Sequence, residues 1–431
     1  MGPQVRSRRG DDRSATPGDG VKREVCGRVL DVRVTGADVT LVVLVDAAVR
    51  CIAAPSLAAA PAPGTLVRVE LDDVGRVSGL EQVSSPGAAW DALGDSTRWS
   101  RVVDGTSRAD VLWRRQDILR ALRDDLREHG FLEVETPLLV PGTCPDLAVE
   151  SVETTCRHYL VTSTEYQLKR LLVGGFERLF SLTRNFRAGD RGAVHSVEFT
   201  MLEWARAWRR LDDIEDDAER LVRRAFHASG AAGDSVPSGG HRVVIDGERW
   251  ERVTLREALR SHLGVLVDET FSLPSIVAGA DRAGLALPPS FRSDAHFATS
   301  FLLGELGPHL GHPLPTFLRA WPAFLTSSAA LDDENPALAA RSELYIGGVE
   351  IADGFPFLRD PVAQRASFER ENQGRTRSGR RAVRLDERYV DALAQGIPPG
   401  AGMAMGVDRL VMALTGQSDI GAVQAFSEQE L

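Results

Sequence analysis

Residues 180–206 constrain the fold of this chain more than any other segment, because they join two extended runs through a polar loop. The segment reads FSLTRNFRAGDRGAVHSVEFTMLEWAR, and a glycine-containing loop between two apolar runs predicts a β-hairpin. In such a hairpin Arg187 stands at the end of the first strand and Phe199 lies on the second. A guanidinium can bind phosphate or carboxylate oxygens in pairs, and an aromatic ring can stack on a base. The hairpin therefore predicts contacts for a nucleotide and a carboxylate.

A glycine-rich strand that leads into a helix near the C-terminus carries a second predicted nucleotide contact. It reads GMAMGVDRLVM over residues 402–412. Glycines such as Gly406 allow a nucleotide to approach the backbone, and Arg409 supplies a second fixed charge for a triphosphate. A glycine-rich turn is weak evidence by itself, so this segment gains weight only together with the hairpin.

Two acidic residues lie between these segments, within ELYIGGVEIADGFPFLRD at residues 343–360. Glu343 and Glu350 offer hard oxygen ligands that suit Mg²⁺ on ATP. Two acids on a strand also occur on an ordinary solvated face, so the sequence leaves both interpretations open.

A long amphipathic helix precedes the hairpin. Ser107 and Asp110 have the spacing of a capping box, and the apolar face that follows has helical periodicity up to Gly130. The next residues, GFLEVETP, predict a strand that cannot pair fully at Pro137. An ordinary helix–strand junction would have the same appearance.

Composition sets the broad class. The chain has 431 residues with a formal net charge of −10, which argues against a general nucleic-acid binder but leaves room for a local basic path. No apolar run is long enough for a membrane helix, and no apolar stretch of a secretory signal follows the N-terminus. The four cysteines form no C-x-x-C pair. We therefore expect a cytoplasmic protein with reduced thiols and no membrane partner.

The pattern along the chain predicts a tail, a small β domain, a linker and a large domain. Residues 1–22 lack apolar periodicity and predict a disordered tail. Residues 23–85 predict a small β-barrel of the OB-like kind, residues 86–110 a linker, and residues 111–431 the catalytic domain. The strands expected in the barrel are Val25–Val34, Val39–Val45, Val67–Leu71 and Val74–Leu80. Residues 230–247, rich in Gly, Ser and Pro, predict a surface connection.

The separated segments together resemble the class II aminoacyl-tRNA synthetases, with their three motifs in order. The similarity is greater to the lysyl branch and greatest to the elongation factor P β-lysine ligases. It rests on TSTEYQLKRLLVGG, HSVEFTMLEWAR, VEIADGF, GVDRLVM and DIGAVQAFS, and it covers about residues 110–430. The resemblance implies an α+β fold with an antiparallel sheet flanked by helices, and a homodimer whose interface lies near Pro137. The ligases usually lack an N-terminal barrel, so this chain combines features of both groups.

The resemblance also implies roles for the matching residues, with ATP and Mg²⁺ as cofactors. Arg187 would hold the α-phosphate and the substrate carboxylate, and Arg409 would join it as the second catalytic arginine. His195 would lie near the outer phosphates, Phe199 and Arg409 would enclose the adenine, and Glu343 and Glu350 would bind Mg²⁺. The substrate pocket would include Ser163, Glu165, Glu203, Ala205, Asp353, Phe357 and Ala404, with Glu165 on the substrate amine.

Several positions depart from the family pattern. Phe357 replaces a Glu that pairs with the side-chain ammonium of lysine, Ala205 replaces a Tyr and so is expected to enlarge the pocket, and Asp353 replaces an Asn. A buried ammonium without its carboxylate would cost several kcal/mol, so we expect that lysine and β-lysine are not the natural substrates. Ala404 matches the β-lysine ligases, whereas lysyl-tRNA synthetases carry Gly. The motif 2 Glu is Gly189 here, and Asp190 is a possible substitute.

The predicted barrel bears on the acceptor. Residues 24–89 contain no Phe, Tyr or Trp, and five arginines stand against eight acidic residues. Because RNA-binding barrels use stacking rings and positive charge, we expect that tRNA is not the acceptor. Three hypotheses remain: transfer of an activated amino acid to an amine of a protein or small molecule, aminoacylation of tRNA, and a non-catalytic protein that senses an amino acid.

Overall fold

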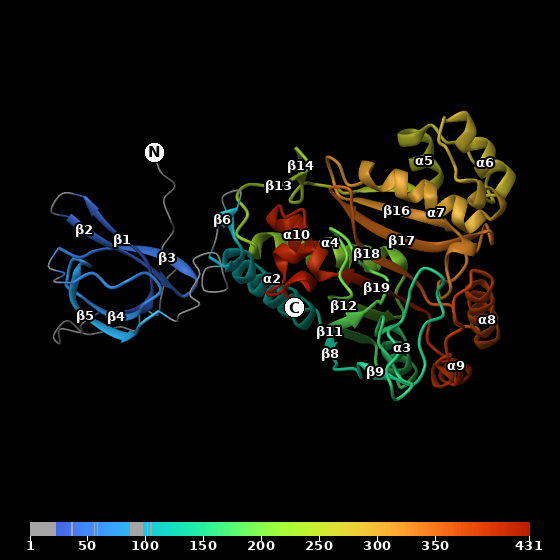
Figure 1. Cartoon of the computed structure of the whole chain (residues 1–431). Coiled ribbons are helices and arrows are strands. Elements are labelled where there is room, and N and C mark those ends of the chain that lie inside the picture. The colour runs from blue at the N-terminus through green and yellow to red at the C-terminus, as the bar shows by residue number, and fades with distance from the viewer. Residues whose placement is uncertain are drawn as a thin grey trace. The chain divides into compact units, whose positions relative to one another are not determined.

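The computed structural model describes residues 23–35, 38–55, 57, 59–86, 98–100, 102, 103 and 106–431. The chain divides into two compact units between Asp110 and Val111, and each is described by itself (Figure 1). The predicted tail at residues 1–22 lies outside the described residues, as does much of the predicted linker.

The N-terminal unit contains a five-stranded antiparallel sheet in the order β3-β2-β1-β4-β5. Its inward side chains form one apolar core that includes Val29, Leu41 and Val67. The long strand β1 pairs with both β2 and β4, and its register with β2 shifts between Val29 and Asp31, as at a β-bulge. The sheet is consistent with an OB-like domain, whereas a closed barrel stays a prediction. The strands are β1 (Arg23–Thr35), β2 (Asp38–Val45), β3 (Ala48–Ala53), β4 (Leu66–Leu71) and β5 (Val77–Ser84); β3 was not expected from the sequence.

The helix α2 (Arg108–Glu128) begins at the expected capping box. The Asp110 N–H donates to Ser107 Oγ at 3.1 Å, and the Ser107 N–H donates to Asp110 Oδ2 at 3.3 Å. Val111, Ile118 and Leu122 on α2 are buried in the main core of the C-terminal unit, as the helical periodicity predicts.

The C-terminal unit is built on an eight-stranded sheet in the order β15-β16-β17-β18-β19-β12-β11-β8. Only the two outer pairs are parallel, so the expected α+β fold with an antiparallel sheet flanked by helices is confirmed. The strands are β8 (Leu132–Glu133), β11 (Arg178–Phe186), β12 (Glu198–Ala207), β15 (Glu251–Thr254), β16 (Thr316–Pro322), β17 (Leu338–Ile346), β18 (Val349–Pro356) and β19 (Gly400–Gly406).

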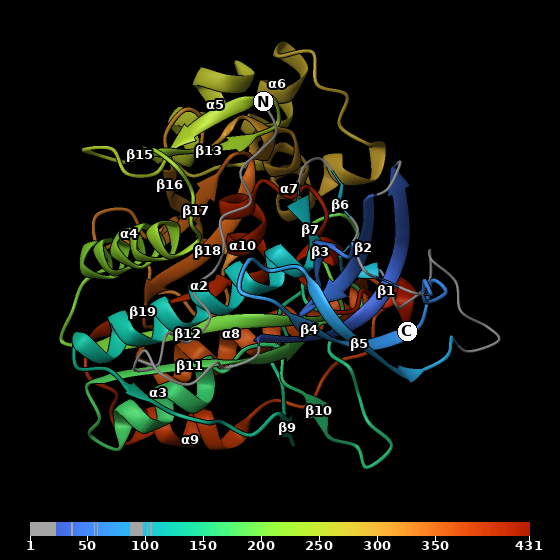
Figure 2. The same cartoon turned by 90° about the vertical axis from the view of Figure 1, so that its left-hand side faces the viewer.

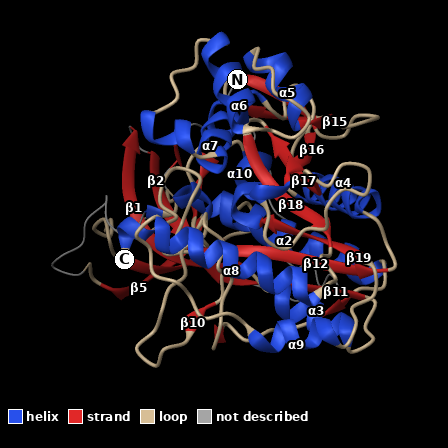
Figure 3. Ribbon diagram, turned by 90° about the vertical axis from the view of Figure 1, so that its right-hand side faces the viewer, coloured by secondary structure: helices blue, strands red, loops and turns tan. Residues whose placement is uncertain are grey.

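Helices cover both faces of this sheet (Figures 2 and 3). Successive side chains of a strand point to opposite faces, and apolar side chains lie on both faces here. On β12, Trp204 belongs to the core shared with α2, α4 and α10, whereas Ala205 belongs to the cluster shared with α3, α8 and α9. A third core joins α5, α6 and α7 to β16 and β17. The helices are α3 (Glu165–Val173), α4 (Leu211–Ala228), α5 (Leu255–Leu263), α6 (Leu273–Arg282), α7 (Ala295–Leu306), α8 (Pro361–Arg377), α9 (Glu387–Ala394) and α10 (Val407–Thr415).

The prediction of a plain surface connection at residues 230–247 is wrong. The segment forms a hairpin of β13 (Ser235–Ser238) and β14 (His241–Val244). Gly239 and Gly240 both have positive φ, which suits a two-residue hairpin turn. Val236 and Val243 are buried in the main core. Burial of these two valines favours paired strands, although the segment is rich in turn-forming residues.

The remaining described elements of the two units are short. β6 (Val102–Val103) pairs with β7 (Thr106–Ser107), and β9 (Leu139–Val140) pairs with β10 (Tyr159–Leu160). Five short 3₁₀ helices are found among the described residues: Pro289–Ser293, Gly307–His309, Ala323–Leu325, Ile420–Val423 and Glu428–Glu430. Among the described helices, none combines the length and the apolar character needed to cross a membrane.

Candidate active site

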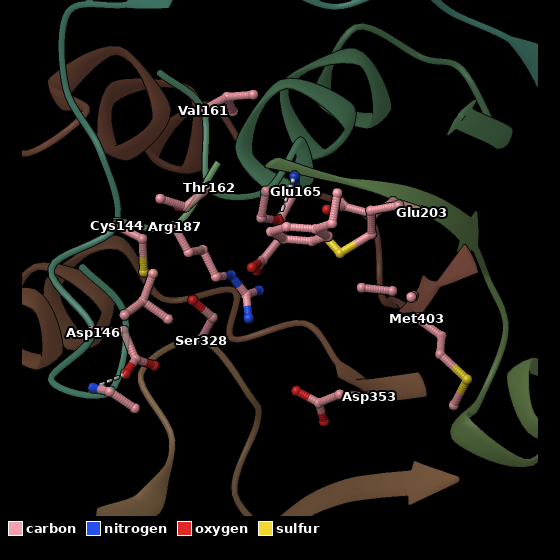
Figure 4. A pocket seen from close by; sticks show the side chains of 18 of the residues that line it. Cys144, Asp146, Val161, Thr162, Glu165, Arg187, Glu203, Ser328, Asp353 and Met403 are labelled. Carbon is pink, nitrogen blue, oxygen red and sulfur yellow. Dashed lines mark hydrogen bonds between the residues drawn. The ribbon is translucent and has the colours of Figure 1, made fainter. Parts of the chain in front are cut away.

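One cavity of about 420 Å³ lies against the sheet face that carries Glu203 and Ala205 (Figure 4). All the predicted site residues line it, although they come from segments far apart in the chain. They are Ser163, Glu165, Arg187, His195, Phe199, Glu203, Ala205, Glu343, Glu350, Asp353, Phe357, Ala404, Gly406 and Arg409. The structure therefore brings the whole predicted set together, while the role of each residue stays a proposal.

The predicted hairpin is present as β11 and β12, and Arg187 follows the last residue of β11. Its backbone N–H donates to the Val197 carbonyl at 2.9 Å, and its guanidinium lies 5.2 Å from the centre of the Phe199 ring. Asp190, the suggested substitute for the missing motif 2 Glu, is 4.0 Å from Arg187. Arg187 Nε is buried and has no hydrogen-bond partner among the described residues. This side chain therefore keeps a donor for an incoming anion.

The glycine-rich strand β19 and helix α10 place Arg409 at the same cavity. Its Nε donates to the Val194 carbonyl at 3.0 Å, and its Nη1 donates to the backbone carbonyl and carboxylate of Glu350 at 3.0 and 3.1 Å. Nη2 lies 2.6 Å from His195 Nε2. Burial, and then the charge of Arg409, lower the pKa of His195, so a neutral imidazole can accept from this arginine. Arg409 thus ties the hairpin loop to β18.

Glu343 does not lie on a solvated face. Its side chain is buried, and it accepts hydrogen bonds from Arg341 and from the Tyr345 hydroxyl, both at 2.8 Å. Burial and the neighbouring charge of Glu350 raise the pKa of Glu343 well above its usual range, while Arg341 opposes that shift. Two interacting acids at one cavity suit a site that receives a cation.

A β-bulge brings Glu350 to the cavity. The register of β17 and β18 shifts between Leu344 and Tyr345, which face Ala352 and Glu350. Ile351 and Ala352 consequently both point into the main core, and Glu350 returns to the cavity face. No group of three or more His, Cys, Asp or Glu residues suited to a metal is found in the described part of the chain. Glu343 and Glu350 fit Mg²⁺, which commonly takes one or two protein carboxylates beside phosphate oxygens.

A buried ion pair that the sequence analysis missed occupies the other end of the cavity. Lys169 is 1% exposed, and its Nζ lies 2.5 Å from Glu165 Oε1. The same ammonium lies 4.9 Å from the centre of the Phe357 ring, 5.3 Å from that of Phe355 and 5.9 Å from that of Tyr389. Glu165 and Lys169 are four residues apart on a helix, so the i, i+4 spacing was the available signal. A cation of the protein itself therefore stands beside Phe357.

Phe357 and Ala205 share one apolar cluster. A Cβ added to Gly400 would lie 2.8 Å from Phe357 Cε2, and one added to Gly402 would lie 3.3 Å from Cε1. The Phe357 ring thus lies against Gly400 and Gly402 of β19. Gly402 is the strand-pairing partner of Ala205 on β12. The Phe357 ring therefore lies in the same cluster as Ala205, and the larger pocket expected from Ala205 stays a prediction.

Glu203 is a buried acid without an ion-pair partner among the described residues. It accepts the Thr164 N–H at 3.0 Å and the Thr164 hydroxyl at 2.8 Å, and burial raises its pKa. The neighbouring Ser163 Oγ accepts the Glu165 N–H at 3.1 Å. Glu203 can therefore meet a polar or charged substrate group, because the groups of Thr164 that donate hydrogen bonds to it are uncharged.

The antiparallel sheet flanked by helices is consistent with the catalytic domain of a class II synthetase. The family model of class II tRNA synthetases (D, K and N) matches residues 96–430, and the chain belongs to this family. Among its relatives are lysine–tRNA ligases of Pasteurella multocida (strain Pm70) and Histophilus somni (strain 2336), each 33% identical over 320 residues. The matched region covers 72% of this chain and 63% and 62% of those two proteins. The chain thus spans less than two thirds of the length of these relatives.

Proposed function

We propose that this protein activates an amino acid with ATP as an aminoacyl-adenylate and transfers the acyl group to an amine of a protein or small molecule. The observation that carries the proposal is that Arg187, Arg409, the acid pair Glu343 and Glu350, and the buried Glu203 line the same cavity. Membership of the class II family supports the activation step.

The chemistry needs no covalent nucleophile. A carboxylate oxygen of the amino acid forms a bond to the α-phosphorus of ATP, the bond to the bridging oxygen breaks, and pyrophosphate leaves with that electron pair. Arg187 would hold the α-phosphate and the carboxylate through the several N–H groups of its guanidinium, of which Nε–H has no partner among the described residues. Arg409 would contact the adenine together with Phe199, His195 would lie at the outer phosphates, and Gly406 would leave room for the nucleotide. Mg²⁺ held by Glu343 and Glu350 would neutralise phosphate charge.

The amino acid in this proposal is not lysine. The Lys169 ammonium already lies 4.9 Å from the Phe357 ring centre, so a second ammonium there would meet a like charge and no carboxylate from residue 357. Desolvating such an ammonium costs several kcal/mol. The pocket favours a substrate with one amine, held by Glu165 or Glu203, and a side chain without a terminal cation.

Aminoacylation of tRNA is the second candidate, because the relatives are named lysine–tRNA ligases. Against it stands the N-terminal segment 24–89, which has more acidic than basic residues and no aromatic ring. The motif resemblance to the β-lysine ligases, which is a prediction from the sequence, also favours an acceptor other than tRNA. We propose a homodimer with Pro137 near its interface, as the family resemblance implies.

ATP–pyrophosphate exchange with a panel of α- and β-amino acids tests this proposal. We expect exchange with an amino acid other than lysine, and no charging of total tRNA with that amino acid. Strong exchange with lysine would refute the pocket argument, and tRNA charging would favour the second candidate. Tight ATP binding without exchange across the panel would favour the non-catalytic amino-acid sensor.

The variant Phe357→Glu tests the specificity argument with Phe357→Gln as its matched control. The Glu variant restores the carboxylate of the family pattern, while the Gln variant has nearly the same shape without the charge. We expect Phe357→Glu to raise lysine-dependent exchange by at least roughly tenfold over the Gln variant, which corresponds to about 1.4 kcal/mol. Equal exchange by both variants would show that residue 357 does not select against an ammonium.

A further inference from the structure

We propose that Arg341 is a positioning residue that fixes two carboxylates of the site at once. One is Glu343, at the proposed metal end, and the other is Asp353, at the amino-acid end. The inference rests on the proposed function, because it assigns Arg341 a part in that same site. Neither the motif analysis nor the family resemblance pointed to this residue.

The guanidinium of Arg341 uses each of its nitrogens. Nε and Nη2 donate to the two oxygens of Asp353 at 2.8 and 3.1 Å, and Nη2 also donates to Glu343 Oε1 at 2.8 Å. Nη1 donates to the Leu325 carbonyl at 2.8 Å. A planar fork bound on all sides has one orientation, so it fixes the positions of both acids.

An aromatic ring supports this orientation. The guanidinium carbon lies 4.6 Å from the centre of the Trp321 ring, within the range of a cation–π contact. Trp321 is itself buried, and its Nε1–H donates to the Leu318 carbonyl at 2.9 Å. The Arg341 side chain is therefore held between a fixed ring and two carboxylates.

Strand pairing explains why the two acids need a shared cation. Glu343 on β17 lies directly opposite Asp353 on β18, and like charges in that relation repel each other. Arg341 precedes Glu343 by two residues, so it points to the same face. The family pattern has a neutral Asn where this chain has Asp353. In this chain Arg341 therefore has to balance two carboxylates, whereas beside an Asn it would balance one.

Loss of Arg341 would leave Glu343 and Asp353 facing each other, with the Tyr345 hydroxyl as the remaining donor to Glu343. The two carboxylates would then separate, and Glu343 would leave the orientation in which it can serve a metal-bound triphosphate. A residue that acted only on folding would lower stability without changing the affinity of the folded protein for Mg²⁺·ATP.

The experiment compares ATP binding with Mg²⁺ and with EDTA by calorimetry, for the full chain and its variants. For Arg341→Met we expect ATP affinity to fall about tenfold in Mg²⁺ and to change little in EDTA, a loss of about 1.4 kcal/mol. Arg341→Lys, which keeps a charge but not the fork, should lie between wild type and Arg341→Met. The double variant Arg341→Met with Asp353→Asn should regain part of the loss, because it removes the repulsion.

The outcomes separate the inference from the proposed function. If the wild-type protein binds ATP no better with Mg²⁺ than with EDTA, the proposed function loses its metal site. If the wild type shows the Mg²⁺ dependence and Arg341→Met keeps it unchanged, only the role of Arg341 is refuted. If Arg341→Met does not fold, the Arg341→Lys variant tests the role of Arg341 instead. An ATP affinity of this variant that depends on Mg²⁺ as strongly as that of wild type would refute the role.

Discussion

Replacing Arg115 by Met removes the cation that balances a buried acid beside Arg409. Arg115 Nη1 lies 2.6 Å from Asp408 Oδ1, and these side chains are 11% and 2% exposed. The Thr200 N–H donates to the other oxygen of Asp408 at 2.6 Å, so the acid links α2, β12 and α10. Removing one partner of such a pair costs about 3–5 kcal/mol, because the remaining charge stays buried. That is a large share of the roughly 5–15 kcal/mol that keeps a domain folded.

Urea unfolding, followed by tryptophan fluorescence and circular dichroism, measures this loss. Five of the seven tryptophans lie in residues 111–431, so the fluorescence reports mainly on the C-terminal unit. The matched control is Arg120→Met on the same helix, where Arg120 pairs with Asp117 at 3.1 Å and is 68% exposed. An exposed pair contributes about 0–1 kcal/mol. Equal free energies of unfolding for the two variants would refute the argument that burial makes the Arg115 pair important.

Three further variants test other parts of the same unit. Because burial raises the pKa of Glu203 above its ordinary value of 4.5, the folded protein loses stability as pH rises from that value through the folded-state pKa. Glu203→Gln should therefore gain stability relative to wild type between pH 4.5 and neutral pH in thermal melts, and a constant difference would contradict this. Gly304→Ala on α7 meets open space and should raise the free energy of unfolding by about 0.5–1 kcal/mol. Gly402→Ala would place a Cβ 2.8 Å from the Trp204 carbonyl oxygen and should lower that free energy by about 1–3 kcal/mol.

Local patterns in the sequence predicted the elements that carry the site. The hairpin of β11 and β12 and the unit of β19 and α10 both follow from short-range signals, namely a glycine-containing loop and a glycine-rich strand before a helix. The hairpin of β13 and β14 could not be predicted by composition, because its turn residues outnumber its two inward valines. The tertiary core decides that segment, since Val236 and Val243 are buried in it.

The sequence predicted which residues meet at the cavity, but it did not predict their partners. Lys169 and Arg341 carry signals in retrospect: one lies four residues after Glu165 on a helix, and the other two residues before Glu343 on a strand. Such spacings occur on many exposed surfaces. Lys169 and Arg341 differ from such surface residues because both lie against aromatic rings. For Arg341, the strand register also places Asp353 opposite Glu343. Neither can be obtained without the fold.

Ala205 and Phe357 are two departures from the family pattern that lie in the same buried cluster of the structure. Taken separately, Ala205 predicts an enlarged pocket and Phe357 predicts the loss of a carboxylate. In the structure both belong to one buried cluster, and the Phe357 ring lies against Gly402, the register partner of Ala205. The large ring at 357 and the small side chain at 205 therefore pack in the same cluster. The effects of substitutions at such neighbouring residues are not additive. The Phe357 ring also lies beside the Lys169 ammonium, so we expect Phe357→Glu combined with Ala205→Tyr to change lysine-dependent exchange by an amount that differs from the sum of the two single changes.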